Sequence, residues 1–84
     1  MTKEIEIQVE RQNHGDWIKI HMPYRSSETI IALLQNEYGE IVRRVKLTEG
    51  NNSIDISNIN NSTINLKIET PYETVLKKLK LNEL

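Results

Sequence analysis

EGNNSIDISNINNSTINLKIET, residues 49–70, contains two alternating patterns of apolar and polar residues with turn-forming segments around them. Ile54 and Ile56 alternate with polar residues in the first pattern, and residues 64–69 form the second. A period of two is typical of a strand with one face in the core and one in water. Gly50 and the Asn residues after it favour a turn, because Gly and Asn adopt left-handed backbone conformations most readily. The stretch therefore predicts two short strands of a half-buried sheet.

The same pattern continues on both sides of this stretch. We expect seven strands, at residues 4–10, 17–22, 29–35, 40–47, 53–56, 64–69 and 73–81. Turn-forming residues recur at roughly 8–12-residue intervals, which is typical of a sandwich rather than of βαβ units. The apolar residues are mostly Ile, Leu and Val, with no Phe and one Trp, and this composition favours strands. The predicted fold class is all-β, a sandwich of about seven antiparallel strands, with residues 1–84 forming a single domain.

The segment at residues 36–39, Asn-Glu-Tyr-Gly, predicts a hairpin turn. The apolar run before it suits a short strand better than a helix, because the turn follows at once. Closing the hairpin over four residues places Leu34 opposite Ile41 and Leu33 opposite Val42, on opposite faces of the pair.

The inward phase of the strands defines the expected core. Leu76, Leu79 and Leu81 cannot all point inward from a regular final strand. We therefore expect a bulge near Lys77 and Lys78 that restores their facing. The expected buried residues are Ile5, Ile7, Ile18, Ile20, Leu34, Ile41, Ile54, Ile56, Leu66 and Ile68.

Composition excludes several classes of function. The net charge is −1 with mixed signs along the chain, so we expect no nucleic-acid partner. The longest apolar run, residues 30–34, is far too short for membrane insertion. The N-terminus MTKEIEIQVE has acidic residues where a signal peptide would be apolar, so we expect synthesis in the cytoplasm without a signal peptide. No cysteine is present to supply disulfides or thiolate ligands.

Catalytic and metal sites have little support in the sequence. The two histidines, His14 and His21, fall in a turn and on a polar strand face, whereas a hydrolytic triad needs its members together in a pocket. Metal binding by this pair needs further ligands in fixed geometry, and only Asp16 is near in sequence. We therefore expect no enzyme activity, no catalytic residue, no metal, no cofactor and no small-molecule substrate.

The third and fourth expected strands carry more apolar residues than one buried face needs. Ile31, Leu33 and Val42 then point outward with Arg44 beside them. A contiguous apolar patch on a monomer usually marks a partner site, and apolar residues near Arg are common at interfaces. The alternative is a central third strand covered by a loop or a terminus. Trp17 has two similar interpretations: it caps the core edge, or it anchors a contact as Trp does at hot spots.

Short matches to a known family lie in roughly the last two thirds of the chain. They are Gly39, Glu49-Gly50, Ile54-Asp55-Ile56-Ser57, Ile59, Leu66-Lys67-Ile68 and the lysine-rich residues 77–80. With these residues the chain resembles the type A C-terminal sorting domain of the type IX secretion system of Bacteroidetes. The resemblance implies an immunoglobulin-like sandwich. The family's Gly-x-Tyr element is missing, with Ser62-Thr63-Ile64 in its place, and the chain continues past the basic end through residues 82–84.

Three functional hypotheses follow. The first is a non-enzymatic structural protein, a small accessory subunit that binds protein partners in a larger assembly. The Bacteroidetes resemblance suggests a capsid decoration protein of a bacteriophage of those hosts, which would place it in the virion. The second is a sorting or anchoring module related to type IX secretion. The third is an adaptor that adds extended peptides to a sheet edge.

Overall fold

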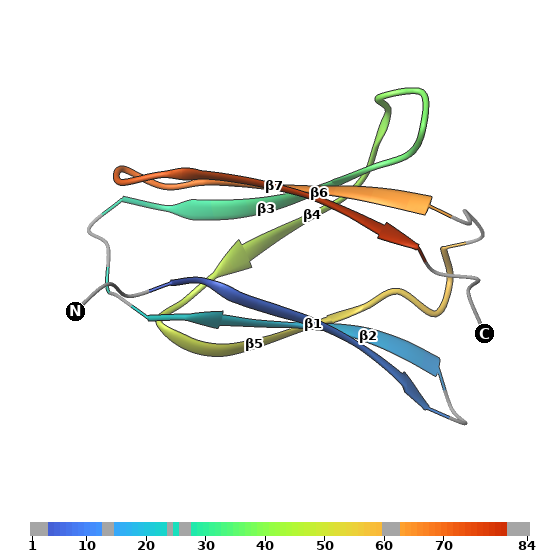
Figure 1. Cartoon of the computed structure of the whole chain (residues 1–84), viewed down its shortest axis with the longest axis horizontal. Helices are drawn as coiled ribbons and strands as arrows, with labels where there is room; N and C mark the ends of the chain where they lie inside the picture. The colour runs from blue at the N-terminus through green and yellow to red at the C-terminus, as the bar shows by residue number, and fades with distance from the viewer. Residues whose placement is uncertain (1–3, 13–14, 24, 26–27, 60–62, 81–84) are drawn as a thin grey trace.

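The computed structural model describes residues 4–12, 15–23, 25, 28–59 and 63–80 (Figure 1). These residues form seven antiparallel strands and no helix, which confirms the all-β prediction. In the described part of the chain, nothing forms a helix with the length and apolar character needed to cross a membrane. The strands are β1 (Glu6–Gln12), β2 (Gly15–Met22), β3 (Ile30–Gln35), β4 (Ile41–Leu47), β5 (Gly50–Asp55), β6 (Thr63–Glu69) and β7 (Thr74–Lys80).

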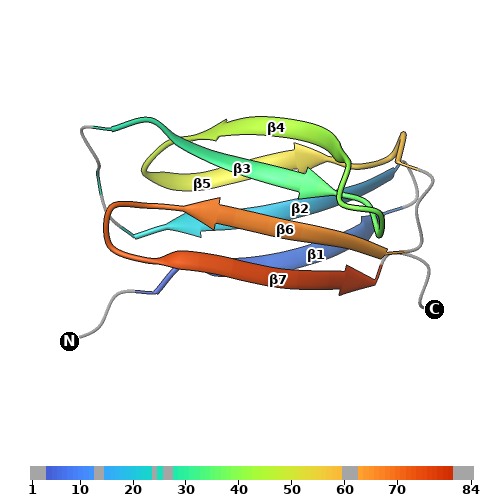
Figure 2. The same ribbon diagram turned by 90° about the horizontal axis from the view of Figure 1, so that it is seen from above.

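The strands form two sheets that pack face to face as the layers of a sandwich. One sheet has the order β1-β2-β5 and the other has the order β4-β3-β6-β7. Figure 1 shows the two layers edge-on, and Figure 2 shows the four-stranded sheet lying over the three-stranded one. The chain crosses between the layers after β2, β4 and β5. Hydrophobic residues of both inner faces fill the space between the layers.

The core is aliphatic apart from Met22. Seven of the expected core residues are buried: Ile18, Ile20, Leu34, Ile54, Ile56, Leu66 and Ile68. Ile5 and Ile7 are half-buried and pack against this cluster, since Ile5 directly precedes β1 and Ile7 lies on it, and β1 is an edge strand. Six further buried residues were not among the expected ones: Met22, Ile30, Ala32, Leu47, Ile64 and Leu79. Each has the inward phase of its strand, so the alternation that identified the strands also accounts for these residues.

The register of β3 and β4 differs from the expected one. Leu34 pairs with Arg43, Leu33 pairs with Arg44, and the register shifts between Leu34 and Gln35. Both predicted pairings, Leu34 with Ile41 and Leu33 with Val42, were therefore wrong. The connection spans residues 36–40 rather than four residues, and a bulge adds one more residue to β4. The core assignment of Ile41 was also wrong, since it pairs with outward-facing Gln35 and is 42% exposed.

β7 pairs with β6 in one continuous register from Thr74 to Lys80, so the expected bulge near Lys77 and Lys78 is absent from this pairing. Leu79 faces the core, whereas Leu76 faces outward and is 73% exposed. The prediction assumed that every Leu of this strand is buried, but an exposed Leu is common on protein surfaces. Leu81 lies outside the described residues.

β5 begins at Gly50, earlier than the expected strand at residues 53–56. Gly50 and Asn51 already pair with β2, so the predicted turn at residues 49–52 was placed too late. Asn52 explains why a very short connection suffices here. Its Oδ1 accepts from Thr48 N at 3.0 Å, and its Nδ2 donates to Thr48 O at 2.9 Å and to Ile20 O at 3.3 Å. One side chain thus satisfies the backbone groups of the crossing.

Candidate functional site

The outer face of the four-stranded sheet combines apolar and cationic side chains in a regular row. Leu33 on β3 lies between Arg44 on β4 and Lys67 on β6, and Lys67 in turn pairs with Leu76 on β7. Directly paired residues point to the same face of an antiparallel sheet. The row that crosses all four strands therefore alternates cationic and apolar residues on the side away from the core.

Two open hollows lie along this face. The first has a volume of about 330 Å³ and is lined by Thr29, Ile31, Leu33, Arg44, Lys67 and Glu69. The second has a volume of about 410 Å³ and includes Gln35, Asn65, Lys67, Leu76 and Lys78. Lys67 lines both, so the two hollows adjoin at this side chain.

The structure brings Ile31, Leu33 and Arg44 together along one hollow, whereas Val42 is the extra residue of the β4 bulge and lines neither hollow. Ile31 is 41% exposed, Val42 is 37% exposed and Leu33 is half-buried. Arg44 is exposed beside Leu33. β3 is central in its sheet, as the alternative interpretation required, but the exposure of Ile31 means that no described segment covers this end of the face.

The charge on this face is strongly positive. Its outward strand positions hold one acid, Glu69, whose Oε1 lies 2.8 Å from Lys67 Nζ. The outward cations are Arg44, Lys46, Lys67, Lys78 and Lys80. Only Arg44 was predicted as part of the site. The alternation in residues 64–69 already placed Lys67 opposite the core phase, so the signal was present in the sequence.

The hairpin between β3 and β4 forms a raised edge at one end of the face. Figure 1 shows it rising above the four-stranded layer, away from the other sheet, and a bulge of the kind found in β4 bends a strand in this way. Tyr38 at its tip is 79% exposed, and the adjacent residues Ile41 and Val42 at its base are also exposed. The raised hairpin thus adds apolar and aromatic surface to the site.

Asn36 fixes the shape of this hairpin. Its Oδ1 accepts from the backbone N of Tyr38 and of Glu40, both at 2.9 Å, and its Nδ2 donates to Glu40 Oε1 at 3.0 Å. Gly39 completes the turn with a φ of 83°, a left-handed conformation that Gly adopts without steric cost. Asn36 itself is 9% exposed, so these bonds are partly shielded from water.

Trp17, the fifth predicted residue, lies on the opposite side of the molecule. It points outward from β2 and is half-buried, with Lys19 Nζ 5.7 Å from its ring centroid. Trp17 pairs with Glu10 of the neighbouring strand β1 and with Asp55 of the neighbouring strand β5. Trp17 therefore belongs to a second surface, the outer face of the three-stranded sheet.

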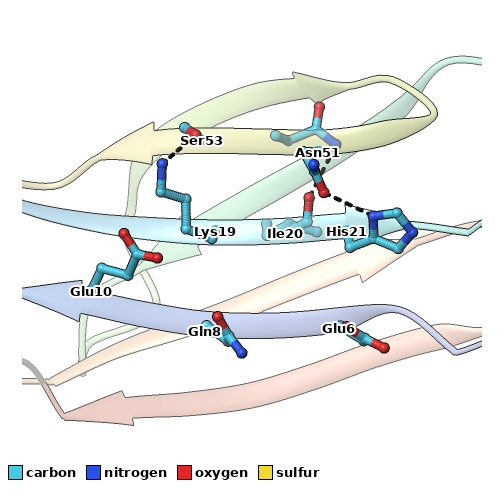
Figure 3. Close-up of a pocket in the computed structure, with 9 residues that line it drawn as sticks. Glu6, Gln8, Glu10, Lys19, Ile20, His21, Asn51 and Ser53 are labelled. Carbon is cyan, nitrogen blue, oxygen red and sulfur yellow. Dashed lines mark hydrogen bonds between the residues drawn. The ribbon is translucent and has the colours of Figure 1, made fainter.

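That second surface is polar and has an open groove of about 450 Å³ (Figure 3). Lys19 Nζ donates to Ser53 Oγ at 3.0 Å, and His21 Nδ1 lies 2.9 Å from Asn51 Oδ1. These bonds link side chains of β2 and β5 across the floor of the groove. Its lining residues are Glu6, Gln8, Glu10, Lys19, Ile20, His21, Asn51, Asn52 and Ser53.

One carboxylate of this side, that of Asp55, has structural partners. Asp55 has a lowered pKa, because its carboxylate is hydrogen-bonded to the side chain and backbone of Ser57 and lies near the Arg43 guanidinium. Arg43 also donates to the backbone carbonyl of Asp55 and so links β4 to β5. Among the described residues, no three His, Asp or Glu side chains lie close enough to hold a metal ion. His14 lies outside the described residues.

No protein-family model matches the chain, and neither a curated protein nor a solved structure matches it significantly.

Proposed function

We propose that this chain is a non-enzymatic interaction protein, a small immunoglobulin-like accessory subunit of a larger protein assembly. It binds a protein partner through the outer face of the four-stranded sheet. The observation that carries the proposal is the row of Arg44, Leu33, Lys67 and Leu76 across that face. Such a row places Arg44, a residue type enriched at interfaces, beside apolar side chains, and Lys67 would lie on the polar rim of the contact.

The exposure of the apolar residues supports this assignment. Ile31, Ile41, Val42 and Leu76 are all at least 37% exposed, and Ile31, Ile41 and Leu76 pair with outward-facing positions of the neighbouring strands. A single exposed Leu or Ile needs no explanation. Ile31 and Leu33 line one hollow of this face and Leu76 lines the adjoining one, and apolar side chains gathered on one surface of a monomer favour a partner.

The rigidity of the β3–β4 hairpin is a second support. Three side-chain hydrogen bonds from Asn36 hold the hairpin before any partner arrives. Tyr38 is therefore displayed on a preorganised loop, which lowers the conformational entropy lost on binding. Tyr is also among the residues that most often dominate binding energy at interfaces.

The immunoglobulin-like assignment rests on strand order. In the seven-strand immunoglobulin sandwich, strands A, B, E and D form one sheet and strands C, F and G form the other, and the variable type adds strand C′ to the second sheet. The order β1-β2-β5 matches A-B-E without strand D, and the order β4-β3-β6-β7 matches C′-C-F-G.

The other two hypotheses have less support. A sorting function rests on the sequence resemblance in residues 39–80. Peptide addition at the β7 edge is disfavoured by its exposed Lys77, Lys78 and Lys80, because charged side chains on an edge strand oppose pairing with another chain.

The substitution Leu33→Asp tests the proposal. The new carboxylate would lie between Arg44 and Lys67, so the isolated domain should remain folded. In a complex that buries this position, the charge would be desolvated and binding would be lost. We expect gel filtration of lysates from the producing cells to show the wild-type chain in a complex well above 9.8 kDa and the variant as a monomer.

Matched variants make the result interpretable. Asn58→Asp adds the same charge at an exposed position of the β5–β6 connection and should leave the complex intact. Arg44→Glu, at an exposed position, repeats the test should Leu33→Asp disturb the fold by far-UV circular dichroism. The proposal fails if folded Leu33→Asp and Arg44→Glu variants both remain in the complex.

A further inference from the structure

We propose that the partner bound by the four-stranded sheet is a second copy of this chain, which presents the outer face of its three-stranded sheet. Copies then stack head to tail, with the row around Leu33 on the row around Trp17. This inference rests on the proposed function, since it names the partner of the same surface.

The two rows are complementary in charge and in layout. On the four-stranded sheet, Leu33 is flanked across the strands by Arg44 and Lys67. On the three-stranded sheet, an aromatic residue takes the place of the leucine and two acids take the place of the cations. The residues of that second row are Glu10, Trp17 and Asp55.

The spacing of the rows matches because both are set by strand pairing. Neighbouring strands lie about 4.7–4.9 Å apart in any sheet, so the two flanking residues of each row lie two strand spacings apart. Placing Leu33 over Trp17 therefore brings the two cations over the two carboxylates. The contact has an apolar centre and a charged periphery, as protein interfaces do.

The charges around these rows extend the match over both faces. The outward strand positions of the three-stranded sheet hold three acids, Glu6, Glu10 and Asp55, and one cation, Lys19. Figure 3 shows Glu6, Glu10 and Lys19 on this face. The four-stranded face has five cations and one acid at its outward positions. The net charge of −1 therefore conceals two faces of opposite sign.

The position of the faces determines the kind of assembly. They lie on opposite sides of the sandwich (Figure 1), so a molecule cannot pair its own two rows. A contact between two different faces is heterologous and leaves one face of each kind open at the ends. A foreign acidic partner would occupy the Leu33 row and leave Trp17 unexplained, whereas a stack of copies uses both rows.

Existing contacts set the strength of the association. Lys67 Nζ is already paired with Glu69 at 2.8 Å, and Lys19 lies over the ring of Trp17. Docking must exchange the first contact and displace or accommodate the second.

Asp55 Oδ1 already accepts from Ser57 N at 2.9 Å and lies near Arg43, so it offers a docking cation only its remaining acceptor positions. Exposed ion pairs contribute little individually and are screened by salt. We therefore expect association that is weak, rises with protein concentration and disappears at about 1 M salt, where the Debye length is about 3 Å.

Sedimentation velocity of the purified full chain tests the stack. The wild-type chain should show a sedimentation coefficient that rises with concentration in low salt. Arg44→Glu reverses one charge of the basic row, and Trp17→Ser removes the centre of the acidic row. Each variant alone should lose the concentration dependence. An equal mixture of the two variants should form a dimer and no larger species. Arg44→Glu supplies an intact Trp17 face and Trp17→Ser supplies an intact Leu33 face, and the other face of each variant cannot pair.

Several outcomes would overturn the inference. A wild-type chain that stays monomeric in low salt excludes the stack. If Leu33→Asp still releases the chain from its cellular complex, the proposed function stands with a different partner. Association that survives in Trp17→Ser indicates a symmetric dimer through the basic face and also overturns the stack. If Trp17→Ser fails to fold, Glu6→Lys replaces it, since Glu6 is exposed on an edge strand.

Discussion

Replacing Asn36 with Ala should loosen the β3–β4 hairpin and lower the stability of the whole domain. The amide of Asn36 accepts two backbone hydrogen bonds, from Tyr38 N and Glu40 N, and donates one to Glu40 Oε1. All three are lost in the Ala variant. The hairpin keeps two backbone bonds, Asn36 N to Glu40 O at 2.9 Å and Gly39 N to Asn36 O at 3.0 Å.

The expected loss follows from the number and setting of these bonds. Each backbone bond to the amide is worth about 0.5–1.5 kcal/mol net, so two contribute about 1–3 kcal/mol. The third adds little, because the carboxylate of Glu40 is exposed and water replaces the donor. A domain of 84 residues has roughly 4–13 kcal/mol of stability in total, so the change is a measurable share.

Urea unfolding followed by far-UV circular dichroism measures this difference, with a linear extrapolation to water. In a Glu40→Gln background, which removes the carboxylate that lies 3.0 Å from Asn36 Nδ2, Asn36→Asp keeps the accepting oxygen and should lose less stability than Asn36→Ala. Asn58→Ala, at an exposed position, should stay within about 0.5 kcal/mol of wild type. Amide hydrogen exchange at Tyr38 and Glu40 should accelerate in Asn36→Ala. A change below 0.5 kcal/mol together with unchanged exchange at both amides would refute the role assigned to Asn36.

Two further predictions concern the core and the acid range. Leu66→Ala should lower the free energy of unfolding by about 2–5 kcal/mol, whereas Ile41→Ala should cost about 0.5 kcal/mol or less, because Leu66 is 0% exposed and Ile41 is 42% exposed. Calorimetry that ranks the two variants in the opposite order would contradict the observed register. The pKa of Asp55 is lowered from 3.8 by its bonds to Ser57, so its ionised form stabilises the fold above pH 3.8, and this contribution disappears as the pH falls through the lower, folded-state pKa. In Asp55→Asn, the urea concentration at the unfolding midpoint should fall less steeply than in wild type as the pH is lowered. If the two chains lose stability equally on acidification, Asp55 is not a source of the pH dependence.

Local alternation was sufficient to predict the faces of the strands. Ile18, Ile20 and Met22 share one side of β2, while Trp17 and Lys19 share the other, as the sequence predicts. The period of two is a property of each strand alone and needs no knowledge of its neighbours.

Strand pairing could not be predicted in the same way. The position of Ile41 depends on the bonds of the Asn36 side chain and on a bulge in β4, neither of which leaves a mark in the hydrophobic pattern. The prediction of a bulge in β7 was wrong for a different reason. It assumed that Leu76 is buried because it is hydrophobic, but Leu76 lies on an edge strand and is exposed.

The candidate site was predicted in part. Ile31 and Leu33 followed from the phase of a single strand, and the structure places both on the outer face. The opposite charges of the two faces were not predicted, because they depend on which strands share a sheet. Glu10 and Asp55 are far apart in the sequence and meet only through their common pairing with Trp17.

The aliphatic core has a consequence for spectroscopy. None of the aromatic side chains in the described part of the chain lies in the core: Trp17 is half-buried, Tyr38 is 79% exposed and Tyr72 is 71% exposed. The interior therefore contributes almost no absorption in the near-ultraviolet, and the emission of Trp17 is a poor monitor of unfolding. The same emission is a sensitive monitor of contact at the outer face of the three-stranded sheet, because Trp17 lies on that face, opposite Tyr38. Trp17 is the single tryptophan of the chain, so the unlabelled protein can report by its own indole fluorescence whether the outer face of the three-stranded sheet has been covered.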